Sequence, residues 1–289
     1  MISFKKRYNG ADIAIVIFMT IFGLIILYPF YNSMLVSLVP QHVYIKTPFM
    51  LYPSEIDLSS YRFVFSSNAI GNGFKVTSII LVVGVIYNML LTTMTGFALT
   101  KPIPGRKFFS MMIIFTMYFG GGLIPTYLLI QQLGLMNNIL AMILPTGIQI
   151  TYMLIIMKFF DELPKELEES AKIDGANDIV VLMKIALPLS LPILATFSLY
   201  YGVERWNEWW SGMLYIKSSS LLPLQTVLRS IVQDANMLTN NIPEDMKKDV
   251  FSDGIKMASV MVTMFPVMCL YPFLQRYFIT GLTTGAVKS

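Results

Sequence analysis

The charged side chains of this sequence gather in one stretch, residues 161–188, which lies between two long apolar runs. Carboxylates serve acid–base catalysis when neighbouring environments push their pKa values apart. In this stretch they are interleaved with lysines, as on a solvated surface: Asp161, Glu162, Glu166, Glu168, Glu169, Asp174 and Asp178 stand among Lys165, Lys172 and Lys184. This pattern does not indicate a buried acid–base pair.

The first half of the stretch has the pattern of a short helix. Pro164 suits the first turn of a helix, where its missing N–H costs nothing. Glu168 precedes Lys172 at the i, i+4 spacing of a helical ion pair. Gly175 then interrupts the pattern, as a turn residue does.

The second half has the pattern of another helix. Asn177 or Asp178 can cap its first turn. Apolar residues follow at i, i+3, i+4 and i+7, which predicts one apolar stripe: Ile179, Leu182, Met183 and Ala186. We therefore predict a helix–turn–helix outside the bilayer, with an apolar face that needs a partner.

The sequence offers few residues or motifs for disulfides, metal binding or catalysis. The chain has one cysteine, Cys269, and one histidine, His42, so neither an internal disulfide nor a Cys- or His-rich metal site is expected. The sequence contains no G-x-x-x-x-G-K-[ST], H-E-x-x-H or G-x-S-x-G motif. We expect no enzyme, no metal and no cofactor in this chain, and any energised work must draw on another chain.

The composition is that of an integral membrane protein. Of 289 residues, 55% are hydrophobic and only 13% are charged, with a mean hydropathy of +0.64. A soluble domain of this length carries about a quarter charged residues. We expect an all-α membrane protein with six transmembrane helices, at about 13–38, 74–99, 108–130, 139–160, 189–210 and 256–273.

Basic residues orient these helices by the positive-inside rule. With the N-terminus inside, the cytoplasmic segments hold Lys5, Lys6, Arg7, Lys101, Arg106, Lys107, Lys158, Lys165, Lys172, Lys184, Arg276 and Lys288. Both termini and the stretch 161–188 are then predicted to face the cytoplasm of a prokaryotic cell, beneath its plasma membrane.

The stretch 161–188 resembles the "EAA" loop of type I ABC importer permeases. That pattern is Glu-Ala-Ala, three residues, Gly, nine residues, Ile-x-Leu-Pro, and every spacing is matched here, with Ser170 in place of the first Ala. The matching residues are Glu169, Ser170, Ala171, Gly175, Ile185, Leu187 and Pro188, and Asp174 completes the Asp-Gly-Ala turn of the carbohydrate-uptake subfamily.

The resemblance implies a fold and partners. Residues 74–273 would be the five-helix permease core, preceded by an N-terminal stub, first span and outer segment in 1–73 and followed by a cytoplasmic tail in 274–289. In this family the loop docks on an ABC ATPase dimer, which holds ATP and Mg. The other implied partners are a second homologous permease, an extracytoplasmic solute-binding protein and membrane lipid; nucleic acid is not among them.

The C-terminal tail makes the resemblance more specific and indicates permeases for sugar uptake. Residues 276–288 are similar to the tail of the smaller permease of maltose transporters, which reaches into the ATPase interface. The residues that carry this likeness, and the expected ATPase contact, are Gly281, Leu282, Gly285 and Lys288. We therefore expect import of sugars or oligosaccharides.

Polar and glycine residues within the apolar runs are candidates for the translocation path: Tyr87, Asn88, Gly121, Gln149, Tyr152, Glu204 and Asn207. Ionisable residues in a membrane cost free energy unless they are paired or wetted. A polar stripe equally suits hydrogen bonds between helices. The Gly120–Gly122 run with Pro125 resembles a segment of oligosaccharide permeases and predicts either a cavity wall or a close helix contact.

Three other functions remain open at this point. The chain could be the permease of an ABC importer for another small solute. A stand-alone channel or secondary transporter would carry internal repeats and charged pairs within its spans, and neither is evident. A membrane receptor or scaffold would use the hairpin for binding alone.

Overall fold

The computed structural model describes residues 9–47, 49–233 and 251–286, with side chains described as far as Cys269. The chain forms two compact units, Met1–Ser67 with Ser230–Phe265, and Asn68–Arg229 with Pro266–Ser289. Every regular element in the described ranges is a helix. The two units are treated separately below.

The first unit contains α1 (Gly10–Ser37), α2 (Gln41–Lys46), α3 (Ser59–Ser66) and the beginning of α17 (Ser252–Ala286). A small apolar core joins the end of α1 to α2 and is formed by Leu35, Val39, Val43 and Met50. The ring of Tyr44 also packs on that of Phe251, with centroids 5.3 Å apart. Most of α1 is exposed and apolar, as expected of a helix that lies in lipid.

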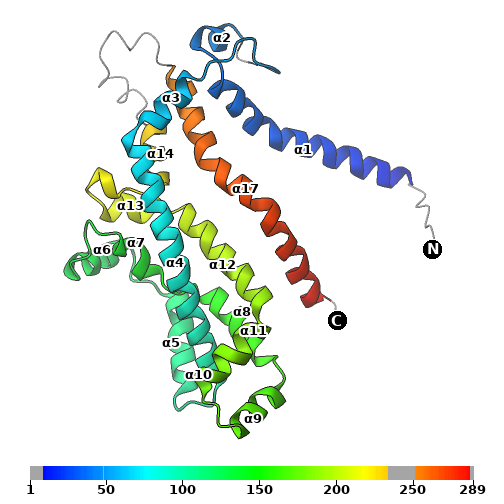
Figure 1. The fold of residues 1–289 in the computed structure, drawn as a ribbon, viewed down its shortest axis with the longest axis vertical. Helices are drawn as coiled ribbons and strands as arrows, with labels where there is room; N and C mark the ends of the chain where they lie inside the picture. Colours follow the sequence, from blue (N-terminus) through cyan, green and yellow to red (C-terminus); the bar gives the residue numbers. More distant parts are fainter. Residues whose placement is uncertain (1–8, 48, 234–250, 287–289) are drawn as a thin grey trace. The chain divides into compact units, whose positions relative to one another are not determined.

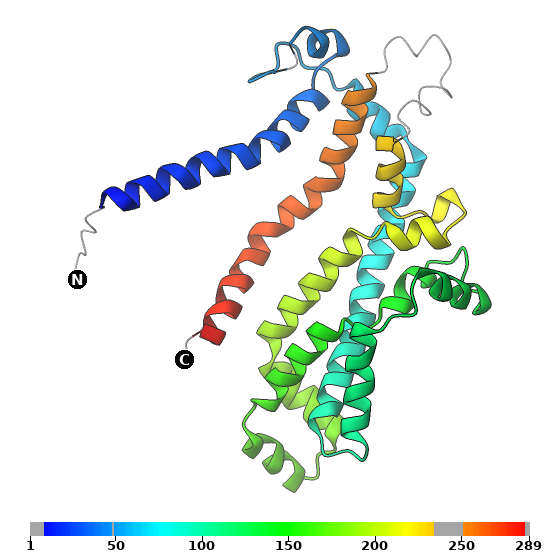
Figure 2. The same ribbon diagram turned by 180° about the vertical axis from the view of Figure 1, so that it is seen from behind.

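The second unit is built on α4 (Asn68–Thr100), against which α8 (Ile150–Asp161) and α12 (Leu191–Trp206) pack. Both views of the fold show these three helices side by side (Figures 1 and 2). Gly96 of α4 lies against the backbone of α8, since a Cβ there would be in ordinary van der Waals contact, 3.5 Å from the Met153 carbonyl oxygen. The apolar runs predicted from the sequence therefore form the centre of this unit.

Shorter helices complete the second unit. They are α5 (Arg106–Tyr118), α6 (Leu123–Gln132), α7 (Leu140–Ile143), the 3-10 turn η1 (Leu144–Thr146), α9 (Lys165–Ile173), α10 (Asp178–Val181), the π turn η2 (Leu182–Ala186), α11 (Leu187–Leu189), α13 (Trp210–Tyr215), the 3-10 turn η3 (Ser219–Leu221) and α14 (Leu224–Gln233). The residues of α14 from Ser230 onward belong to the first unit.

Within the described residues, α1 and α4 are each long and apolar enough to cross a membrane, and up to five spans result if each of three bent helix pairs counts as one. The sixth predicted span falls in α17, which continues beyond residue 273 as one helix to Ala286. The all-α membrane architecture is confirmed, and the count of six spans stays a prediction.

The sequence predicted one of the three bends and not the other two. The chain turns by 115° between α5 and α6, at the predicted glycine break. There a Cβ on Gly120 or Gly122 would have no neighbour within 4 Å in this chain, so the alternative of a close helix contact at these glycines is not supported by the described part of this chain. Bends of 50° after η1 and 86° after α11 were not predicted.

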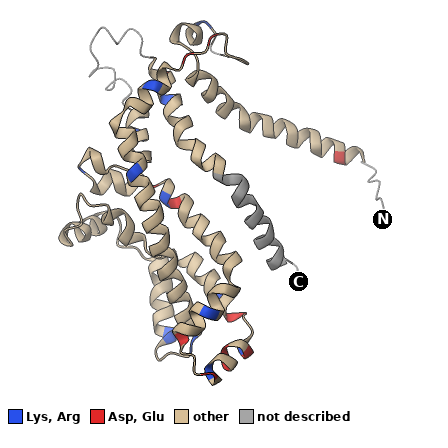
Figure 3. Cartoon of the chain, viewed as in Figure 1, with Lys and Arg blue, Asp and Glu red and all other residues tan. Residues whose placement is uncertain are grey.

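Charged residues are distributed unevenly over the second unit (Figure 3). No charged residue occurs in the last 25 residues of α4, from Val76 to Thr100. Charges instead gather in and around α9 and α10, at one end of the second unit. This end is where the predicted helix–turn–helix lies.

Candidate functional site

The hairpin, defined here as α9 to α11 with its connecting turn, has the predicted helix–turn–helix form. Its turn is a Schellman motif, in which the Gly175 N–H donates to the Lys172 carbonyl at 3.0 Å and the Ala176 N–H donates to the Ala171 carbonyl at 2.9 Å. Gly175 has φ of +86°, a conformation that disfavours residues with a Cβ. The predicted turn at Gly175 is therefore confirmed, and its cause is backbone geometry.

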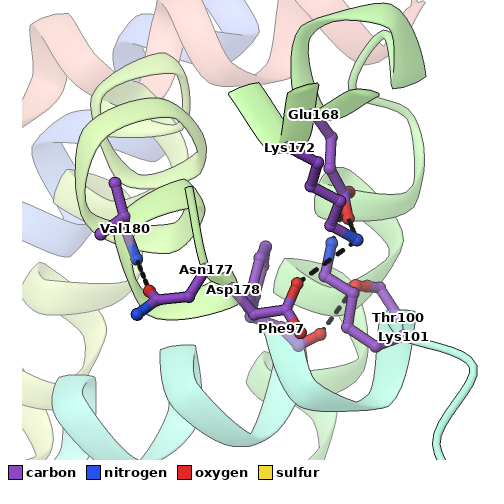
Figure 4. Close-up of polar contacts among 8 residues, drawn as sticks. All are labelled: Phe97, Thr100, Lys101, Glu168, Lys172, Asn177, Asp178 and Val180. Atoms are coloured by element: carbon purple, nitrogen blue, oxygen red, sulfur yellow. Dashed lines mark hydrogen bonds and ion pairs between the residues drawn. The ribbon is translucent and has the colours of Figure 1, made fainter. Parts of the chain in front are cut away.

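The second helix of the hairpin begins at an Asn cap. The Asn177 side-chain oxygen accepts a hydrogen bond from the Val180 N–H at 2.9 Å (Figure 4). This contact satisfies one of the free N–H groups of the first turn. Of the two caps predicted, Asn177 is the one used.

The predicted apolar stripe is wrong in part. Leu182 and Ala186 are buried, but Ile179 is 71% exposed and Met183 is 60% exposed, and Val181 is buried in their place. The reason is the π turn at Leu182–Ala186, which changes the angle between successive residues and so breaks the 3.6-residue register. The inward side chains join a core with Phe97 of α4, Ile156 and Phe160 of α8, and Phe197 of α12.

A chain of ion pairs crosses the hairpin (Figure 4). Lys101, which directly follows α4, pairs with Glu168 of α9. Glu168 also pairs with Lys172 at 2.8 Å, the predicted i, i+4 contact, and Lys172 reaches Asp178 of α10 at 3.4 Å. The chain thus joins α4, α9 and α10 through alternating charges.

These contacts shift the ionisation of the two central groups. Burial raises the pKa of Glu168, but hydrogen bonds from Lys101 and Lys172 outweigh it and hold the pKa below its ordinary value. The hydrogen bond to Glu168 raises the pKa of Lys172. Both groups therefore keep their charges over a wider pH range than they would alone.

The outer face of the hairpin has no partner in the described part of this chain. The most exposed apolar side chains of the hairpin are Ile173 (87%), Ile179 (71%) and Met183 (60%), and Leu167 and Leu189 are exposed to a smaller extent. Glu169, Ser170, Asp174 and Gly175 of the EAA-like pattern are also exposed. Exposed apolar side chains among charges mark interaction sites.

The other residues of the pattern point elsewhere. Ala171 is half-buried and packs on the core below the hairpin, as does Leu187. Ile185 is half-buried and lines a cavity of about 350 Å³ between α9 and the ends of α4 and α8, and Pro188 is exposed. The pattern therefore combines an outward face with residues that attach the hairpin to the unit.

Asn88, predicted to line the path, is instead fully buried. Its Nδ2 donates to the carbonyl oxygens of Thr146 at 2.6 Å and Gly147 at 2.8 Å. Its Oδ1 accepts from Nε and Nη2 of Arg205 at 3.0 and 2.8 Å. Because its polar atoms are bound within the protein, Asn88 does not line a path, and this prediction is corrected.

Arg205 is the centre of this second cluster and is 4% exposed. Besides Asn88, its guanidinium donates to the carbonyl oxygens of Met142 at 2.7 Å, Ile143 at 3.2 Å and Thr146 at 3.1 Å. These carbonyls belong to α7 and η1, the last helical turns before the break that precedes α8. Backbone groups freed inside a membrane must find partners within the protein, and Arg205 supplies them.

The remaining path candidates are accessible. Gln149 and Glu204 are exposed, and Tyr152 is half-buried and donates to Glu204 Oε1 at 2.7 Å. Tyr87 is half-buried, while Gly121 and Asn207 are exposed. These positions remain predictions for the path. In the tail, Gly281, Leu282 and Gly285 lie in the last turns of α17, and Lys288 lies outside the described residues.

Two residues were missed by sequence reasoning. Lys101 was grouped with the basic turn that follows α4, and nothing local distinguishes it from Arg106 or Lys107. Arg205 carried a signal that could have been used, since an ionisable residue at the end of an apolar run needs a partner within the protein. Asn88 was the matching polar residue on another apolar run.

The chain is similar to known proteins in family, in sequence and in structure. Residues 2–284 match the family described as the binding-protein-dependent transport system inner membrane component. The chain is 37% identical over 279 residues to the polygalacturonan/rhamnogalacturonan transport system permease protein YtcP of Bacillus subtilis, covering 96% of this chain and 98% of that protein. It is 30% identical over 274 residues to the arabinooligosaccharides transport system permease protein AraQ of Halalkalibacterium halodurans, covering 91% and 92%.

A solved structure agrees with these relatives. The fold superposes with a TM-score of 0.86 on a chain from the crystal structure of a bacterial ABC transporter involved in the import of the acidic polysaccharide alginate. Sequence identity is 28%, and the match covers 95% of this chain and 100% of that one. The chain therefore belongs to the family of binding-protein-dependent transport system inner membrane components, the non-catalytic permease subunits of ABC importers.

Proposed function

We propose that this chain imports oligosaccharides as one of two homologous permease subunits, and that its hairpin docks on an ABC ATPase dimer. Permeases of this family work with an ATPase and a solute-binding protein. The named relatives are permeases of transport systems for polygalacturonan/rhamnogalacturonan and for arabinooligosaccharides, which supports a saccharide substrate here. ATP and Mg bind to the partner ATPase in this proposal, and lipid surrounds the apolar helices.

The observation that carries the proposal is the outer face of the hairpin. Two of its exposed apolar side chains, Ile179 and Met183, belong to the stripe predicted to need a partner, and four residues of the EAA-like pattern are exposed on the same hairpin. The rim is charged, which suits a contact that forms and releases in water. Nothing in the described residues could hydrolyse ATP by a P-loop, so the energy enters through this face from another chain.

The test uses Gly175, because a Cβ there would meet nothing within 4 Å in this chain. Asn tolerates positive φ, so Gly175→Asn adds a side chain to the docking face with little backbone strain. We expect membrane insertion to persist while uptake of oligogalacturonides or arabinooligosaccharides by a complemented deletion strain falls. Gly134→Asn is the matched control, since Gly134 has φ of +69° and equally open surroundings.

Wild-type uptake by Gly175→Asn would contradict docking at this face. Uptake of amino acids but of no saccharide by the intact transporter would contradict the substrate class instead.

Orientation is tested independently. We propose that both termini and the hairpin face the cytoplasm. In a Cys269→Ser background, a cysteine at Ser220, an exposed residue of η3, should react with an impermeant thiol reagent in whole cells. A cysteine at the exposed Glu166 of α9 should not react. The reverse labelling would place the hairpin on the side without ATP.

A further inference from the structure

The two helices of the hairpin are attached to the second unit by different forces. The segment from α10 to η2 buries Val181, Leu182 and Ala186 in the core that α4, α8 and α12 share. No residue of α9 is buried. Beneath α9 lies the cavity of about 350 Å³, lined by Lys101, Glu168 and Lys172 among others. Packing therefore holds the second helix much more firmly than the first.

The charge on Lys101 strengthens the attachment of α9, which otherwise rests on partly buried residues such as Ala171. Lys101 is 8% exposed, and its ammonium lies 4.1 Å from the centre of the Phe97 ring, a member of the core. A buried ammonium is costly unless it is paired, and its partner is Glu168 on α9. The lysine is thus fixed to α4 by its aromatic contact and to α9 by its ion pair.

Through α4, the same ion pair links the hairpin to the cluster formed by Arg205 and its acceptors. Asn88 lies within α4 and Lys101 directly follows its last residue, so about 20 Å of helix separates them at 1.5 Å per residue. At the Lys101 end, α4 meets the exposed hairpin; at the Asn88 end, it meets the break before α8 through Arg205. A packed helix moves as a rigid element, so a shift at one end reaches the other.

We propose that Lys101 is a positioning residue that fixes α9, with Glu169 and Ser170, to α4, and thereby passes displacement of the hairpin to the membrane helices. This inference rests on the proposed contact between hairpin and ATPase. Lys101 does not touch the ATPase in this proposal. Its role is to make α9 and α4 move together.

The experiment is a double-mutant cycle in the complete transporter, reconstituted in proteoliposomes with its ATPase and solute-binding protein. The variants are Lys101→Gln, Glu168→Gln and the pair, and the measured quantity is solute imported per ATP hydrolysed. Each single variant should lower this ratio about fivefold, the factor for about 1 kcal/mol. The pair should lower it no further, because both changes remove the same contact.

Two controls separate positioning from stability. Lys158→Gln with Glu162→Gln removes an exposed ion pair of 3.7 Å between α8 and the residue that caps its end, and should leave the ratio unchanged. Lys101→Arg keeps the charge and should keep most of the ratio. A residue that acts on stability alone would lower the melting temperature and the amount of complex without lowering the ratio in what assembles.

The outcomes are distinct. A ratio unchanged in the single variants, or one that falls additively in the pair, overturns the role of Lys101 while leaving hairpin docking intact. If Lys101→Gln does not assemble, Glu168→Gln and Lys101→Arg decide the question in the same assay. Failure of the ATPase to co-purify with the unmodified permease would instead refute the proposed function.

Discussion

Among the described side chains of the second unit two cations are buried, Lys101 below the hairpin and Arg205 among the membrane helices. Different kinds of acceptor bind them. Lys101 has a carboxylate, Glu168, which a second lysine shares. Arg205 has the amide oxygen of Asn88 and three backbone carbonyls. The comparison shows that the surroundings of each buried cation determine which kind of hydrogen-bond acceptor is favourable beside it.

The physical reason is the cost of removing ions from water. A carboxylate near the hairpin stays partly hydrated, since the Glu168 side chain is 29% exposed, so an ion pair there costs little to form. A second ion beside Arg205 would have to be desolvated in full. The carbonyls at the helix break need donors in any case, and they solvate the guanidinium without adding a charge.

The largest expected effect comes from removing the guanidinium. Arg205→Ala removes the two guanidinium donors to Asn88 Oδ1 and the three hydrogen bonds to the carbonyls of Met142, Ile143 and Thr146. Each buried acceptor left unpaired costs about 1–3 kcal/mol. We expect loss of most folded protein, measured as monodisperse complex after detergent extraction and by its thermal unfolding. Stability equal to that of the unmodified complex would show that this cluster is dispensable.

A smaller loss is expected from giving Arg205 the acceptor that Lys101 has. Asn88→Asp offers a carboxylate, but one of its oxygens would face the Thr146 and Gly147 carbonyls, which now lie 2.6 and 2.8 Å from the amide nitrogen. We expect thermal stability to fall by about 1–3 kcal/mol. A rise in stability would mean that charge pairing outweighs the loss of donors, and the contrast drawn here would fail.

The Asn177 cap tests whether local contacts in the hairpin act independently of the ion pairs. Asn177→Ala removes the hydrogen bond from the Val180 N–H and should cost about 1 kcal/mol. Hydrogen exchange at residues 178–181 should speed up about fivefold, with little change in the melting of the complex. Asn177→Ser retains a capping oxygen and should exchange nearly as the original does.

The smallest effect is expected from pH near neutrality. Because the pKa of Glu168 is lowered, its contribution is complete above the ordinary value of 4.5 and is lost as pH falls through the lowered pKa. Because the pKa of Lys172 is raised, its contribution is complete below 10.5 and is lost as pH rises through the raised pKa. The ion pairs should therefore persist throughout the neutral range.

Spin labels at Glu166 of α9 and Lys107 of α5, both exposed, report this directly in a Cys269→Ser background. The distance distribution should stay constant between about pH 6 and pH 9 and broaden only below about pH 4.5. The Glu168→Gln variant should be broad at every pH. Broadening of the original protein at neutral pH would show that these charges do not hold α9. The acceptors around Arg205 are amides and carbonyls, which do not titrate.

The sequence by itself determined the features that depend on a few consecutive residues. The turn at Gly175, the cap at Asn177 and the Glu168–Lys172 pair are each set by spacings of four residues or fewer, over which helix geometry is nearly constant. The apolar runs likewise determined the all-α membrane class, because only helices with internally bonded backbones suit such composition. The EAA-like pattern was sufficient to indicate the family.

Only the tertiary structure decided which polar residues meet across the unit. Lys101 and Glu168 are 67 positions apart, and Asn88 and Arg205 are 117 apart. Such contacts depend on how α4, α8 and α12 pack, and on bends at Gly147–Gln149 and Ser190 that no local pattern announced. The π turn was likewise decided by tertiary packing. In this packing Val181 is buried and Ile179 is exposed, whereas an uninterrupted helical periodicity predicts Ile179 on the buried side.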